Sequence, residues 1–129
     1  LMVEPLVMTS NPEGGSSSVS DPEKIATLVR QAVELGADII KVDPVEPMER
    51  FAEVVEIAHP TPVLVRGGGK VTTRELLERT RTAVDVGARG VVYGRNVVQH
   101  PNPPSLVQAL GAIVHSGSSV DDALALVKE

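Results

Sequence analysis

The chain has 129 residues, enough for one domain with a modest hydrophobic core. Hydrophobic residues make up 42% and aromatic residues only 2%, so the core must be aliphatic and the composition argues against disorder. A net charge of −5 excludes a basic surface for nucleic acid or an anionic membrane, and the lack of cysteine excludes disulfides and a thiolate nucleophile. With neither a spanning apolar run nor a leader pattern, we expect a cytoplasmic protein without nucleic-acid or membrane partners.

The first apolar run, at 2–8, is predicted to be a strand. Residue 1 is Leu and the strand follows at once, so we expect that residue 1 is not the biological N-terminus. The stretch 13–18 has the composition of a flexible loop that could close over a substrate. The residues Ser20-Asp21-Pro22-Glu23 form a capping-box pattern, which predicts a helix that ends before Gly36.

The remaining chain alternates short apolar runs, rich in β-branched residues, with amphipathic stretches. A second capping-box pattern begins at Thr72, and Ser119 is the expected cap of the last helix. In chain order these patterns predict strand 38–43, helix 47–58, strand 62–66, helix 72–87, strand 89–93, a helical turn at 97–100, and helices at about 103–115 and 119–128.

An internal repeat supports a fold of strand–helix units. The segment 32–38 resembles the segment 83–89, and a predicted strand follows each of them. A complete eight-unit barrel takes roughly 250 residues, whereas four units are predicted here. The sequence therefore predicts an α/β fold that is either half of a (β/α) barrel or a small open parallel sheet. A half barrel has two open edges, which a second copy or a missing half would need to cover.

Lys41 is the first candidate for chemistry, because it lies near the carboxyl end of an otherwise apolar strand. That end of a parallel sheet or barrel carries the active site. Aliphatic surroundings disfavour the charged form of a lysine, which would make the amine a nucleophile able to form a Schiff base with a ketone or aldehyde. The alternatives are a lysine that extends to solvent at the strand end or one that pairs with Asp43.

Two glycine-containing turns follow the third and fourth predicted strands. The first is Gly67-Gly68-Gly69-Lys70, where free backbone N–H groups and Lys70 would suit a phosphate, although a simple tight turn is the alternative. The second is Gly94-Arg95-Asn96, just before a predicted helical turn. Phosphate sites of barrels often use the loops after the last two strands together with a short extra helix. The pair of turns therefore predicts a phosphate site.

Glu4 is a carboxylate within an apolar strand and could act as a general acid/base. Alternatively, Pro5 marks an edge strand and Glu4 faces solvent. The three histidines, His59, His100 and His115, lie apart from one another in the sequence, and we interpret them as structural. No metal site and no cofactor are predicted.

Together, 36–41, 62–70 and 94–100 resemble the second half of class I Schiff-base aldolases. This barrel family includes archaeal-type fructose-bisphosphate aldolase, tagatose-bisphosphate aldolase and aminodideoxyheptulosonate synthase. The three motifs match in order and spacing, and the resemblance covers nearly the whole chain. It implies strands five to eight of the barrel in one domain, 1–129, with strands five and six in 1–43, strands seven and eight with their phosphate loops in 44–100, and C-terminal helices in 101–129.

The resemblance also implies residue roles. Lys41 matches the Schiff-base lysine, and the turns at Gly67, Gly68, Gly94 and Arg95 match the loops that bind the substrate phosphate. Glu4-Pro5 stands where fructose-bisphosphate members carry Tyr-Pro and looks more like the tagatose-bisphosphate branch. Arg66 and Gly69 depart from the usual pattern of the fructose-bisphosphate members, a small residue followed by Gly-Gly-Pro-Lys.

The sequence thus predicts a class I aldolase that cleaves a phosphorylated ketose and works as a homo-oligomer or with a missing N-terminal half. We expect this chain alone to be inactive or weakly active. Two other functions stay open: an isomerase or synthase on a phosphate-binding barrel without a Schiff base, and a non-catalytic half-barrel module whose edges serve assembly.

Overall fold

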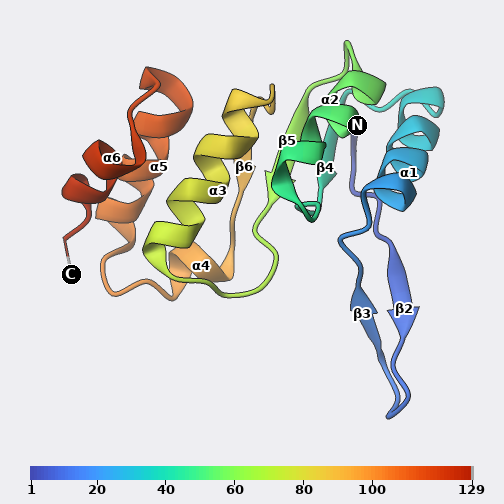
Figure 1. The fold of residues 1–129 in the computed structure, drawn as a ribbon, viewed down its shortest axis with the longest axis horizontal. Helices are drawn as coiled ribbons and strands as arrows, with labels where there is room; N and C mark the ends of the chain where they lie inside the picture. Colours follow the sequence, from blue (N-terminus) through green and yellow to red (C-terminus); the bar gives the residue numbers. More distant parts are fainter. Residues whose placement is uncertain (129) are drawn as a thin grey trace.

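The computed structural model describes residues 1–128. Strands alternate with helices through most of the chain (Figure 1). In chain order the elements are β1 (Met2–Val3), β2 (Met8–Ser10), β3 (Ser16–Ser18), α1 (Pro22–Glu34), β4 (Ile39–Val42), the 3-10 helix η1 (Met48–Arg50), α2 (Phe51–Ala58), β5 (Val63–Arg66), α3 (Thr73–Asp85), β6 (Gly90–Val92), α4 (Arg95–Val98), α5 (Pro103–Ser116) and α6 (Val120–Leu126).

Four strands form the main sheet, in the order β1-β4-β5-β6, and every neighbouring pair is parallel. The register aligns Lys41 with Leu64 and Leu64 with Gly90. Each pair of sequential strands in this sheet is joined through a helix, as parallel pairing requires. The predicted strands at 38–43, 62–66 and 89–93 are therefore confirmed, and so is the α/β class.

One face of the sheet packs against helices. Ile40 and Val42 of β4 and Val63 and Val65 of β5 are at most 1% exposed and share a cluster with residues of α1 and α2. Burial of an aliphatic side chain of this size contributes about 1.5–3 kcal/mol. Because side chains alternate along a strand, the residues between these four point to the opposite side of the sheet, which we call the open face.

The last three helices build a second core. In Figure 1, α3, α5 and α6 follow one another toward the C-terminus. Their buried residues form one apolar cluster, which includes Leu76, Leu77, Leu106, Ile113 and Ala123. This cluster attaches the C-terminal helices to α3, which in turn lies beside β6.

Two of the predicted caps are confirmed and one is shifted. Thr72 and Glu75 form a full capping box at the start of α3, and Ser119 caps α6. At α1, however, Asp21 and not Ser20 is the cap: its carboxylate accepts hydrogen bonds from the N–H groups of Glu23 and Lys24 at 3.0 and 3.2 Å. The reason is Pro22, whose fixed φ suits the first helical position and places the cap one residue before it.

The internal repeat has a structural cause. At the end of α1, the N–H of Gly36 donates to Val33 and that of Ala37 to Ala32; at the end of α3, Gly87 and Ala88 make the same two bonds to Val84 and Ala83. This pattern is a Schellman cap, in which the glycine takes a positive φ, here 83° and 105°. The repeated segment is therefore the helix stop that redirects the chain into the next strand.

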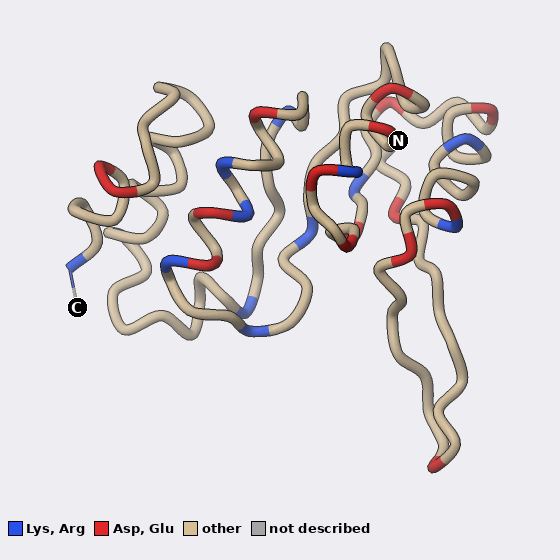
Figure 2. Tube along the Cα trace, in the orientation of Figure 1, with Lys and Arg blue, Asp and Glu red and all other residues tan. Residues whose placement is uncertain are grey.

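The prediction of one strand over 2–8 and a loop over 13–18 is wrong in detail. Only Met2 and Val3 join the sheet, while β2 and β3 form a separate antiparallel hairpin in which Met8 pairs with Ser18. Pro5 lacks a backbone N–H, so the ladder stops near it. All six strand residues of the hairpin are exposed, and it extends away from the sheet with a single acidic residue at its tip (Figures 1 and 2).

Within residues 1–128, no helix combines the length and the apolar character needed to cross a bilayer.

Candidate active site

Lys41 lies on the open face of the sheet. Its neighbours Ile40 and Val42 are fully buried toward the helices, so the side chain of Lys41 points the other way and is 21% exposed. It is the third of the four residues of β4, close to the carboxyl end of the strand. The amine is thus held between aliphatic strands but can be reached from the open face.

Glu4 is the ion-pair partner of Lys41. Val3 is aligned with Ile40, which brings Glu4 beside Lys41, and Glu4 Oε2 lies 2.9 Å from Lys41 Nζ. The side chain of Glu4 is 36% exposed, so this ion pair is open to solvent on the Glu4 side. Lys41 thus pairs with Glu4, while the alternative of an edge strand with Glu4 toward solvent holds in part, because β1 is at the edge of the sheet and Glu4 is exposed.

Arg66 joins the pair to a second carboxylate. Its Nε lies 3.4 Å from Glu4 Oε1, and one of its terminal nitrogens lies 3.3 Å from the Asp43 carboxylate. In the sequence, Arg66 stands out only as a departure from the pattern of the fructose-bisphosphate aldolases. The signal that could have found it is the period of two along β5: with Val63 and Val65 facing the helices, Arg66 must share the open face with Lys41.

Asp43 is the most buried charged group of the site, at 5% exposure. Burial raises the pKa of this carboxyl, and the neighbouring Glu4 raises it further, while Arg66 and Lys41 act in the opposite direction. The net result is a raised pKa, because desolvation is the largest of these effects.

This raised pKa predicts a stabilising substitution. A carboxyl with a raised folded-state pKa binds its proton more tightly in the folded than in the unfolded chain, so its ionisation weakens folding as the pH rises above the usual aspartate range. Asp43→Asn, which resembles the neutral acid, should therefore raise the melting temperature at pH 7, and by less at pH 4. Thermal unfolding followed by circular dichroism at both pH values measures this, and a lower melting temperature at pH 7 would contradict it.

A hollow of about 320 Å³ lies next to Lys41 on the open face. The structure brings five of the predicted site residues to it. Lys41 lines it together with both glycine turns, through Gly67, Gly68, Gly94 and Arg95, and its other lining residues are Arg66, Val92, Tyr93 and Asn96.

Asn96 holds the two glycine turns together. It is 8% exposed, its side-chain oxygen accepts the N–H of Val71 at 3.1 Å, and its side-chain nitrogen donates to the carbonyls of Gly69 and Gly67 at 3.1 and 3.4 Å. Arg79 of α3 donates to the same Gly67 carbonyl at 2.9 Å. With their carbonyls directed to these side chains, the turns have a fixed shape around the hollow.

Tyr93 supports the wall of the hollow from inside the fold. Its hydroxyl lies 2.9 Å from the hydroxyl of buried Thr80 on α3. Burial raises the pKa of this phenol, so it stays neutral across the physiological range. A Cβ at Gly67 would lie 3.2 Å from the Tyr93 ring, so a side chain at this position would require the ring to shift by a few tenths of an ångström.

Gly69 and Lys70 lie outside this hollow. Both are exposed, and Lys70 lines a separate hollow of about 280 Å³ with Thr72 and His100. A Cβ at Gly69 would meet no atom within 4 Å, whereas a Cβ at Gly67 or Gly68 would meet neighbouring side chains. The sequence could not separate the four residues of this turn, because their placement depends on the bonds from Asn96 and Arg79.

His100 takes part in local hydrogen bonds. Its Nδ1 accepts the N–H of Asn102 at 3.0 Å, and its Nε2 lies 3.2 Å from the Thr73 hydroxyl. His59 ends α2 as its C-cap. Among residues 1–128, no three His, Asp or Glu side chains gather in the way a metal site needs.

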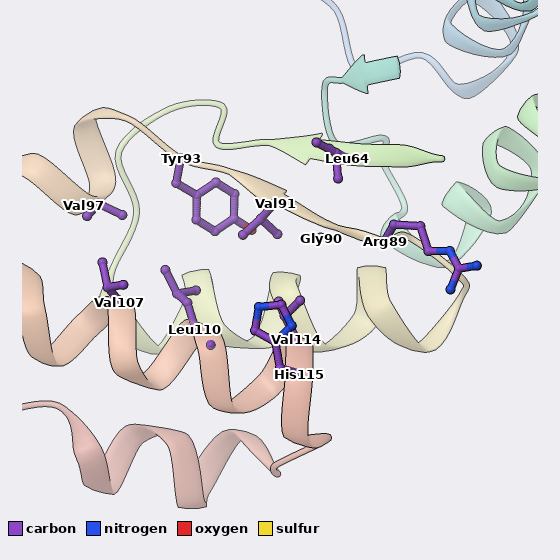
Figure 3. A pocket seen from close by; sticks show the side chains of 11 residues that line it. Leu64, Arg89, Gly90, Val91, Tyr93, Val97, Val107, Leu110, Val114 and His115 are labelled. Atoms are coloured by element: carbon purple, nitrogen blue, oxygen red, sulfur yellow. The ribbon is translucent and has the colours of Figure 1, made fainter. Parts of the chain in front are cut away.

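A larger hollow, of about 450 Å³, lies between β6 and α5 (Figure 3). Leu64, Val91, Val107 and Leu110 give it an apolar lining, and Tyr93 and Val97 lie at one end. None of the predicted site residues lines it. The chemistry-bearing side chains therefore converge on the smaller hollow beside Lys41.

Comparison with known proteins decides the family. The sequence profile described as DeoC/LacD family aldolase matches residues 1–100. This chain belongs to the DeoC/LacD aldolase family. The match includes Lys41 and both glycine turns, and it confirms the resemblance to class I aldolases that the motifs indicated.

Individual DeoC/LacD relatives agree with this assignment. The chain is 42% identical over 121 residues to a class 1 fructose-bisphosphate aldolase of Halobacterium salinarum, covering 93% of this chain and 46% of the relative. It is 36% identical over 121 residues to the 2-amino-3,7-dideoxy-D-threo-hept-6-ulosonate synthase of the same organism, covering 94% of this chain and 45% of that enzyme.

The fold comparison gives the same result. A solved structure of a Schiff-base-forming fructose-1,6-bisphosphate aldolase aligns with a TM-score of 0.73 and 32% identity, covering 88% of this chain and 44% of that one. The chain therefore shares its α/β fold with DeoC/LacD aldolases and spans about half the length of the relatives it matches.

Proposed function

We propose that this chain carries the lysine and the phosphate loops of a class I aldolase that cleaves a phosphorylated ketose. The observation that carries the proposal is the position of Lys41 Nζ: on the open face, 2.9 Å from Glu4, beside a hollow lined by two glycine turns. An amine next to a carboxylate and an anion-binding hollow suits a Schiff base with a phosphorylated ketone.

Imine formation begins when Glu4 takes a proton from the Lys41 ammonium. The neutral amine attacks the carbonyl carbon of the ketose, and the resulting carbinolamine loses water to give the protonated imine. Glu4 lies within hydrogen-bond distance of Nζ, as direct proton transfer requires.

Cleavage uses the imine as an electron acceptor. A base removes the proton of the hydroxyl that becomes the aldehyde, the carbon–carbon bond breaks, and its electron pair moves into the protonated imine to give an enamine. Protonation of the enamine carbon and hydrolysis of the imine then release the ketone product and restore Lys41. We assign proton transfer at the lysine nitrogen to Glu4.

The phosphate would be held by Gly67, Gly68, Gly94 and Arg95, since these four residues line the Lys41 hollow. Glycines allow an anion to approach the backbone N–H groups closely, and Arg95 supplies positive charge. Gly69 and Lys70 do not line the hollow, and we leave them out of this group.

We further propose that 1–129 form one half-barrel domain, equivalent to strands five to eight. Two observations support this: the main sheet has four parallel strands, and the relatives are about twice as long. The edges at β1 and β6 would then meet the other strands of the barrel or a second copy.

Gly94 provides a direct test of phosphate binding. A Cβ at this position meets no atom within 4 Å, so Gly94→Ala should fold normally but place a methyl group beside the hollow. The affinity for inorganic phosphate should fall by about tenfold, which corresponds to roughly 1.4 kcal/mol of binding free energy. Calorimetry on the natural polypeptide that carries these residues measures this. Gly69→Ala is the matched control, since position 69 also has open space but does not line the hollow. Equal affinity in the two variants would exclude Gly94 from the phosphate group.

The proposed reaction is tested by turnover. The natural polypeptide should split ketose phosphates into an aldehyde and a smaller ketone phosphate, and it should act more slowly on the same sugars without phosphate. Borohydride should inactivate it only when substrate is present, because only the imine is reduced. An isomerised sugar as the sole product, together with resistance to borohydride, would favour an isomerase or synthase instead.

A further inference from the structure

Glu4 has two charged partners, one for each carboxylate oxygen. Oε2 lies 2.9 Å from Lys41 Nζ, and Oε1 lies 3.4 Å from Arg66 Nε. Glu4 follows β1, a two-residue strand at the edge of the sheet, and its side chain is 36% exposed. Neither the strand nor burial fixes this carboxylate, so its direction depends on the two cations.

Arg66 is held from its other end by Asp43. A terminal nitrogen of the guanidinium lies 3.3 Å from both Asp43 oxygens, and Asp43 is almost fully buried. The charged groups therefore alternate in sign in the order Lys41, Glu4, Arg66 and Asp43, with no net charge when all four are ionised. Arg66 is the only one of the four that never gives up its proton in a protein.

We propose that Arg66 is a positioning residue, which orients the Glu4 carboxylate toward Lys41 Nζ. The inference rests on the proposed function, in which Glu4 receives the proton of the Lys41 ammonium. The guanidinium of Arg66 lies 3.4 Å from Oε1 and attracts that oxygen, which leaves Oε2 for the lysine.

Asp43 has a role in the same proton transfer from Lys41 to Glu4. When Glu4 becomes protonated, it no longer neutralises Arg66, and an unpaired guanidinium at a partly buried position is unfavourable. Asp43 keeps Arg66 paired before and after the transfer.

The first test measures Glu4 directly and needs no turnover. The natural polypeptide is labelled with carbon-13 at the glutamate carboxyls, and the Glu4 signal is assigned by its absence in Glu4→Gln. In Arg66→Gln, the pH midpoint of the Glu4 signal should rise, because an opposite charge has been removed. Arg66→Lys should restore at least half of the change, and Arg81→Gln, which disrupts the separate pair with Asp85, should leave the midpoint unchanged.

The second test shows whether Arg66 acts through Glu4. The rate of borohydride trapping with dihydroxyacetone phosphate at pH 7 should fall about tenfold in Arg66→Gln, and this loss should nearly vanish in the Glu4→Gln background. Equal losses in both backgrounds, or an unshifted Glu4 midpoint, would overturn the assignment of Arg66. Absence of trapping in the unmodified protein would instead reject the proposed function, while the carbon-13 titration would still decide the role of Arg66.

Discussion

Replacing Lys41 with methionine should lower the rate of ketose phosphate cleavage by on the order of 10⁴-fold or more, since the imine can no longer form. Methionine is similar in length and unbranched, and Lys41 is 21% exposed, so the sheet should keep its packing. The cleavage rate is followed through the aldehyde product, and the circular dichroism spectrum verifies the fold.

Lys24 offers a matched control for this substitution. It lies on α1, its side chain is 65% exposed, and its nearest acidic partner is Asp21 at 3.8 Å. Lys24→Met should therefore keep nearly the full rate of cleavage. If Lys41→Met also kept this rate, Lys41 could not be the nucleophile.

The second large effect is expected at Asn96. Asn96→Ala removes the partner of the Val71 N–H and of the Gly67 and Gly69 carbonyls. Loss of these contacts should lower the free energy of unfolding by roughly 2–3 kcal/mol. It should also weaken phosphate binding by at least about tenfold, because the two turns would lose their fixed shape. Denaturant unfolding and phosphate calorimetry measure the two effects.

Thr72→Ala is the control for Asn96→Ala, because it lowers the stability of the fold without removing the Asn96 contacts. It removes the side-chain cap of α3 and should cost about 1 kcal/mol of stability. It leaves the three Asn96 contacts in place, so phosphate affinity should stay unchanged. If both variants lost phosphate affinity in proportion to their stability, Asn96 would have no specific role in shaping the site.

The elements that the sequence predicts best are those with strong local patterns. The runs at 38–43 and 62–66 are short, aliphatic and rich in β-branched residues, and they correspond to β4 and β5. The cap of α3 is a property of Thr72 and Glu75 alone. Lys41 could be recognised because a charged residue between Ile40 and Val42, inside an aliphatic strand, is unusual.

The hairpin shows where local patterns fail. The run at 2–8 is as apolar as the other strands, but Pro5 interrupts it and only Met2 and Val3 pair in the sheet. The serines of β3 give no strand signal, because their pairing with β2 comes from the turn between them and not from apolar spacing.

The charged cluster could be predicted only in part. Glu4 and Lys41 each stand out in the sequence as a charged residue in an apolar run. Their contact depends on the alignment of Val3 with Ile40, which no local pattern encodes. The pairing of Asp43 with Arg66 likewise requires the order and register of β4 and β5. Long-range register is therefore the information that the sequence patterns lacked.

The most direct test of the central claim is to map the covalent adduct. The natural polypeptide is treated with borohydride in the presence of dihydroxyacetone phosphate, digested, and analysed by peptide mass spectrometry. We predict that the reduced adduct lies on the peptide that contains Lys41, and not on those with Lys24, Lys70 or Lys128. An adduct on another lysine, or none at all under conditions of turnover, would contradict the account.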